Sequence, residues 1–85
     1  MADVKILEGK KVLIVDDEPD VLEALEDALD MCDIDTSTEY ETAKELLESK
    51  NYDIAVLDIM GVNGYELLAV AHSKGIPAVM LTAHA

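Results

Sequence analysis

Three aspartates stand directly after runs of apolar residues, at points where the chain leaves its core. The run VLIV at 12–15 ends at Asp16 and Asp17, and the run IAVL at 54–57 ends at Asp58. If the two runs are neighbouring parallel strands, their carboxylates meet at one edge of the sheet. Carboxylates this close oppose each other's ionisation unless a cation neutralises them. Mg²⁺ suits such an edge because it binds a few carboxylate oxygens and keeps several waters. The sequence therefore predicts a Mg²⁺ site at these three aspartates.

The same edge could carry phosphoryl chemistry. A metal between carboxylates can hold the oxygens of a phosphoryl group while one carboxylate attacks phosphorus and forms an aspartyl phosphate. Thr82 follows the later apolar stretch AVML at 78–81. Its hydroxyl could donate to a phosphate oxygen if that stretch is a strand of the same sheet.

The elements that must position these residues alternate along the chain. Strands are predicted at 12–15, 34–38, 54–57 and 78–81, and helices at 19–32, at 40–50 and over a third stretch that stops near Gly75. A β-α-β-α-β-α-β order predicts an α/β fold, in which a parallel sheet has helices on both faces. In such sheets the functional site lies outside the carboxyl ends of the strands, which is where the aspartates stand.

Composition limits the classes of function. The chain has 85 residues and 51% hydrophobic content, which predicts one small domain with a packed core. A net charge of −13 would repel nucleic-acid phosphate and anionic lipid, so we expect no direct binding to either. The single Cys32 excludes an internal disulfide, and the first ten residues hold no long apolar stretch. These features predict a cytoplasmic protein without a membrane span.

The residues at this edge resemble the receiver domain of two-component response regulators. VLIVDDEPD, YDIAVLDIM and PAVMLTAHA match the family at its first, third and fourth strands. The resemblance implies a flavodoxin-like sheet in the order 2-1-3-4, in a signalling module rather than an enzyme. It implies Mg²⁺ held by Asp17, Asp58 and the backbone carbonyl of Met60, with Asp16 helping through a water. It also implies that Asp58 takes a phosphoryl group from a sensor histidine kinase or phosphotransfer protein, and that Thr82 senses it.

Two departures from the family pattern have consequences. The family usually has a Met-Pro pair after the phosphoacceptor, whereas this chain reads DIMGVNG over 58–64 with no proline. The chain ends at Ala85, so the family's fifth strand, last two helices, phosphoryl-contacting lysine and aromatic switch residue are missing. We therefore expect residues 1–85 to form an incomplete receiver domain. A bare fourth strand and an uncovered sheet face predict a homo-oligomer formed through the exposed edge or through an exchanged element, or else a partly molten monomer.

Other interpretations of the same residues stay open. Asp16 and Asp17 could cap the helix that begins near Pro19, because acids are favoured at helix N-termini. The chain could be a self-assembling interaction fragment without phosphoryl chemistry. It could also be a phosphohydrolase of the haloacid dehalogenase type with Asp58 as nucleophile. Such enzymes need a second aspartate two positions further on, where this chain has Met60.

Overall fold

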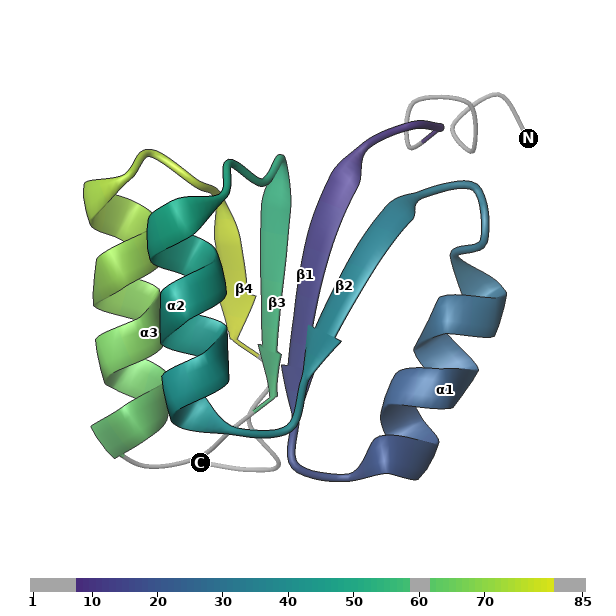
Figure 1. The fold of residues 1–85 in the computed structure, drawn as a ribbon, viewed down its shortest axis with the longest axis horizontal. Coiled ribbons are helices and arrows are strands. Elements are labelled where there is room, and N and C mark those ends of the chain that lie inside the picture. The colour runs from purple at the N-terminus through teal and green to yellow at the C-terminus, as the bar shows by residue number, and fades with distance from the viewer. Residues whose placement is uncertain (1–7, 59–61, 81–85) are drawn as a thin grey trace.

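The computed structural model describes residues 8–58 and 62–80, and all the segments predicted from the sequence form in the predicted order. The elements are β1 (Lys11–Asp16), α1 (Pro19–Ala28), β2 (Asp33–Ser37), α2 (Tyr40–Ser49), β3 (Ile54–Asp58), α3 (Val62–Ser73) and β4 (Ala78–Met80) (Figure 1). None of the described helices is long and apolar enough to cross a membrane.

The boundaries differ from the predicted ones at a few places. The helix predicted over 19–32 ends at Ala28, because the chain turns there to enter β2. The backbone N–H of Leu29 donates to Leu25 at 2.9 Å, and that of Cys32 donates to Leu29 at 2.9 Å. The strand predicted over 54–57 extends through Asp58. Leu81, predicted as the end of the last strand, lies outside the described residues.

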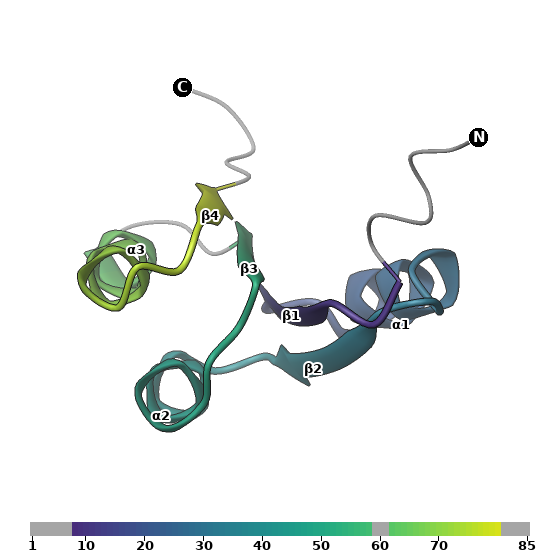
Figure 2. The same cartoon turned by 90° about the horizontal axis from the view of Figure 1, so that it is seen from above.

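The strands form one parallel sheet in the order β2-β1-β3-β4, which confirms the predicted flavodoxin-like topology. Figure 2 shows α2 and α3 on one face of the sheet and α1 on the other, over the β1–β2 side. β1 lies between β2 and β3, and both of its faces are buried. Its wholly apolar run follows from this central position, because a strand covered on both sides exposes no face to water.

Successive residues of β1 point to opposite faces and contribute to two separate cores. Leu13 and Val15 belong to the larger core, under α2 and α3, whose other buried members are Ala43, Leu47, Tyr52, Ala55, Leu57, Leu67, Ala71 and Ile76. Val12 and Ile14 pack with Leu22 of α1 in the smaller core. A slip of one residue in the pairing of β1 would exchange these two sets, so packing fixes the register of the sheet.

A hydrogen-bonded pair ties the outer strand β2 to the segment that precedes β3. The hydroxyl of Tyr52, whose ring is buried, donates to Oδ2 of Asp35 at 2.7 Å, and Nζ of Lys50 approaches the same oxygen at 3.1 Å. The hydrogen bond from Tyr52, with help from Lys50, lowers the pKa of Asp35. Burial, followed by the hydrogen bond to Asp35 and the charge of Asp35, raises the pKa of Tyr52 well above its usual range. The pair therefore favours an ionised Asp35 and a neutral Tyr52.

Removing the tyrosine hydroxyl should lower stability and weaken its dependence on acid. We expect Tyr52→Phe to lose about 1–2 kcal/mol at pH 7, because the carboxylate of Asp35 loses a hydrogen-bond donor. A lowered pKa contributes stability above its ordinary value of 3.8 that is lost as pH falls through the folded-state pKa. The gap between wild type and variant should therefore shrink in urea unfolding at pH 3. Tyr65→Phe, at an exposed position, serves as the control and should change little. An equal gap at pH 7 and pH 3 would contradict this assignment.

Candidate functional site

The edge formed by the carboxyl ends of the strands brings two of the predicted site residues side by side. Asp16 is the last residue of β1 and Asp58 is the last residue of β3. They are direct partners in the parallel register, and neighbouring strands lie only about 4.8 Å apart. Asp16 is 2% exposed, whereas Asp58 is half-buried. The prediction that the two apolar runs are adjacent strands is confirmed.

The carboxyl group of Asp16 is only half satisfied by the protein. Its Oδ1 accepts a hydrogen bond from the backbone N–H of Glu18 at 2.8 Å. Its Oδ2 is buried and has no hydrogen-bond partner among the described residues. A buried acceptor without a donor is costly and calls for a cause such as an ion or water.

The electrostatic environment of Asp16 also favours a positive charge near its carboxyl group. Burial raises the pKa of Asp16, and the neighbouring Asp58 raises it further. The N–H of Glu18 and the side chain of Asp17 act in the opposite direction. The protein alone therefore disfavours ionised Asp16 next to Asp58, and a cation at this edge would reverse that preference.

Neither Asp16 nor Asp17 is the N-cap of α1, so the helix-capping interpretation is wrong. The residue that precedes the first turn of α1 is Glu18, whose side chain makes no capping hydrogen bond, and Pro19 occupies the start of the helix. Asp16 instead accepts from the backbone two residues on, as aspartates do in tight turns. One oxygen of Asp16 thus shapes the entry into α1, which leaves the second oxygen unexplained by this role.

Of the other predicted site residues, the structure describes only Asp17. Asp17 follows β1 and is exposed, and Met60 and Thr82 lie outside the described residues. Within 8–58 and 62–80, no group of three or more His, Cys, Asp or Glu side chains is arranged to hold a metal ion. The site seen here is a carboxylate pair with an orphaned oxygen. That donor set fits Mg²⁺, which is commonly held by one or two carboxylates and completed by waters.

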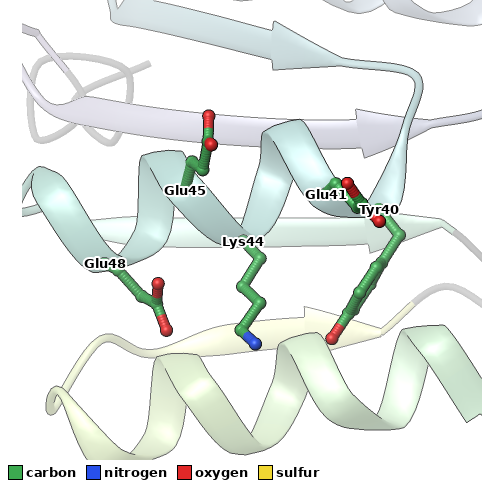
Figure 3. Close-up of a pocket in the computed structure, with 5 residues that line it drawn as sticks. All are labelled: Tyr40, Glu41, Lys44, Glu45 and Glu48. Carbon is green, nitrogen blue, oxygen red and sulfur yellow. The ribbon is translucent and has the colours of Figure 1, made fainter.

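A groove on the surface of α2 is chemically different. It has a volume of about 280 Å³ and is lined by Tyr40, Glu41, Lys44, Glu45 and Glu48 (Figure 3). Three of its five lining residues are glutamates, and neither Asp16 nor Asp58 lines it. These glutamates would repel a phosphate group more than Lys44 would attract it. The groove is therefore a weaker candidate for phosphoryl chemistry than the edge of the sheet that carries Asp16 and Asp58, called the acidic edge below.

Local sequence does not signal the contacts of Lys74 and Tyr52 or the unpartnered oxygen of Asp16. Each depends on contacts between segments far apart in the chain, and no local spacing signals them. The burial of Asp16 Oδ2 depends on tertiary packing around the end of β1, which local sequence does not reveal.

A four-stranded parallel sheet in the order 2-1-3-4, with carboxylates at the ends of its two central strands, defines a flavodoxin-like receiver fold. The sequence model of the response regulator receiver domain family matches residues 12–85, so the chain belongs to this family.

Relatives and solved structures agree with this membership. The heme response regulator HssR of Staphylococcus aureus is 41% identical over 76 residues. The match covers 84% of this chain and 34% of HssR, so the chain spans about a third of that relative. Response regulator TrrA of Thermotoga maritima, in complex with Mg²⁺-BeF, has a TM-score of 0.79 and 35% identity, covering 89% of this chain and 71% of TrrA. A CheY-like receiver domain protein of Methanospirillum hungatei has a TM-score of 0.80 and 25% identity, covering 92% of this chain and 67% of that one.

The strain between Asp16 and Asp58 should be measurable without metal. A raised pKa means that the folded state loses stability as pH rises through it, and Asp58 contributes to that rise. We expect Asp58→Asn in EDTA to be at least as stable as wild type at pH 7, with the difference closing toward pH 4. Urea unfolding across this range makes the comparison. Asp27→Asn, on the exposed side of α1, controls for removal of one negative charge. A loss of stability in Asp58→Asn at pH 7 would contradict the proposed repulsion.

Proposed function

We propose that Asp58 is a phosphoacceptor, which receives a phosphoryl group from a sensor histidine kinase or a phosphotransfer protein in a Mg²⁺-dependent step. The observation that carries the proposal is the register pairing of Asp16 with Asp58, together with a buried oxygen of Asp16 that has no hydrogen-bond partner within 8–58 and 62–80. TrrA has been crystallised with Mg²⁺-BeF, and also in complex with the histidine kinase ThkA, in a structure that has a TM-score of 0.75 to this chain. These relatives support the metal and the class of partner.

The proposed reaction needs little from the protein beyond a placed nucleophile. A carboxylate oxygen of Asp58 attacks the phosphorus of a phosphohistidine on the partner. An O–P bond forms, the N–P bond breaks, and its electron pair returns to the imidazole of the partner. Asp58 is half-buried at the end of a strand, so its carboxylate has a fixed position and remains reachable from outside.

The neighbours of Asp58 take supporting roles in this proposal. Asp16 and Asp17 would hold Mg²⁺ together with Asp58 and the backbone carbonyl of Met60. The bound ion would supply positive charge to the carboxylates and to the phosphoryl oxygens. Thr82 would donate its hydroxyl to one of those oxygens. Asp16 is positioned for its role by the N–H of Glu18, which holds Oδ1 and leaves Oδ2 for a ligand or its water.

The chain would act as a signalling module, with any output carried by other segments or partners. The matched relative HssR is about three times as long as the matched region. We propose the cytoplasm as the location, because the sequence has a single cysteine and therefore makes no internal disulfide.

A second candidate function is self-assembly without phosphoryl chemistry. Among the described strands, β4 pairs only with β3, and Val79 on β4 is 45% exposed. An unpaired edge with an apolar side chain can pair with the same edge of a second copy. The two candidates differ in what Asp58 is needed for.

Intact-mass measurement after incubation with Mg²⁺ and acetyl phosphate separates them. We expect wild type to gain one phosphoryl group, because the carboxylate of Asp58 would act as the nucleophile and Mg²⁺ would bind at the same edge of the sheet. Asp58→Asn should gain none, and Asp53→Asn, on a residue just before β3, is the matched control and should still react. No gain in wild type, together with light scattering that grows with concentration, would overturn the first function and favour self-assembly.

A further inference from the structure

Lys74 makes an unusual set of contacts for a lysine at the surface. Its Nζ donates to the backbone carbonyl of Leu47 at 2.7 Å, of Glu48 at 3.1 Å and of Lys50 at 3.1 Å. An ammonium group has three N–H donors, so three carbonyl acceptors use its full capacity. All three carbonyls belong to the C-terminal end of α2, whose capping residue is Lys50.

These carbonyls need a partner from outside their own helix. The last carbonyls of an α-helix have no intrahelical donor, and they carry the negative end of the helix dipole. The last turn of α2 contains no basic residue, and the N–H of Lys50 reaches only Leu46, at 2.9 Å. Lys74 supplies the missing donors and adds a positive charge at these carbonyls, across 24 to 27 positions of sequence.

The backbone of Lys74 is itself held firmly by the end of α3. The N–H of Gly75 donates to His72 at 3.0 Å and the N–H of Ile76 donates to Ala71 at 2.9 Å, while Gly75 has a φ of 73°. This is the Schellman arrangement, in which a left-handed glycine closes the helix. Ile76 then enters the larger core with Ala71. Lys74 therefore projects from a fixed position.

The opposite ends of the two helices are also in contact. Tyr40, at the start of α2, extends toward α3 (Figure 3), and Glu66 of α3 raises the pKa of the Tyr40 hydroxyl. In addition, the side chains of Leu47 of α2 and Leu67 of α3 lie in the same core. The helices are thus joined near both ends and along their length.

We propose that Lys74 caps α2 from the end of α3 and thereby makes the two helices one unit, which opens and moves together. Without this cap, the C-terminal turn of α2 would have unsatisfied carbonyls and would open separately from α3. The unit borders the acidic edge, because α3 begins at Val62, shortly after Asp58. The inference rests on contacts far from that edge and does not depend on phosphoryl chemistry.

Native-state amide hydrogen exchange on the full 85-residue chain tests this proposal. In wild type we expect the protected amides of α2 and α3 to exchange through a common opening as urea increases, as members of one cooperative unit do. In Lys74→Met, amides at 46–50 should exchange at least roughly tenfold faster, because a charged group no longer satisfies the carbonyls. The protection of α3 should change much less, so the two helices separate in their opening.

Matched variants distinguish the cap from a general loss of charge. Lys74→Arg keeps the donors and the charge and should retain the common opening. Lys10→Met removes an exposed lysine elsewhere and should behave as wild type. Should Lys74→Met not fold, Lys74→Gln gives the same comparison with a neutral side chain. The proposal is overturned if wild-type α2 and α3 open independently, if the neutral variants at Lys74 keep the common opening, or if Lys10→Met loses it.

Discussion

The structure depends on a conflict between burial and charge at the ends of two adjacent strands. β1 and β3 pair in parallel along their length, so their final residues, Asp16 and Asp58, must meet at one edge. Asp16 is almost fully buried there, with one oxygen satisfied by Glu18 and the other without a partner in the part of the chain that the structure describes. A sequence selected for stability alone would not place these residues in this way, since each feature costs free energy. A function that brings positive charge to this edge removes the conflict.

The rest of the fold keeps that edge in place. The alternating faces of β1 feed two cores, one under α2 and α3 and one under α1, and together they fix the register that aligns Asp16 with Asp58. Polar contacts reinforce the layers at points away from the site. Tyr52 and Asp35 hold the outer strand, and Lys74 closes the end of α2. The apolar interior therefore sets where Asp16 and Asp58 lie. The polar contacts of Tyr52 and Lys74 limit how far the helices and the outer strand can shift.

Much of this could be predicted from local sequence, and the remainder could not, for a physical reason. Apolar runs such as 12–15 predicted the strands. The family resemblance supplied the strand order, which makes β1 and β3 neighbours and brings Asp16 next to Asp58. The end of α1 was predicted four residues too late, because the turn into β2 is set by backbone contacts around Cys32. The buried oxygen of Asp16 and the reach of Lys74 arise only from tertiary packing. Roles for Met60 and Thr82 stay predictions, since both lie outside the described residues.

If the carboxylates of Asp16 and Asp58 form a cation site, Mg²⁺ must stabilise the folded protein, and a Mg²⁺ titration of thermal unfolding measures this directly. An ion that binds only the folded state raises the melting temperature with its concentration. Wild type should show such a rise, and the double variant that combines Asp16→Asn with Asp58→Asn should lack it. A melting temperature that is the same with Mg²⁺ and with EDTA would contradict the claim.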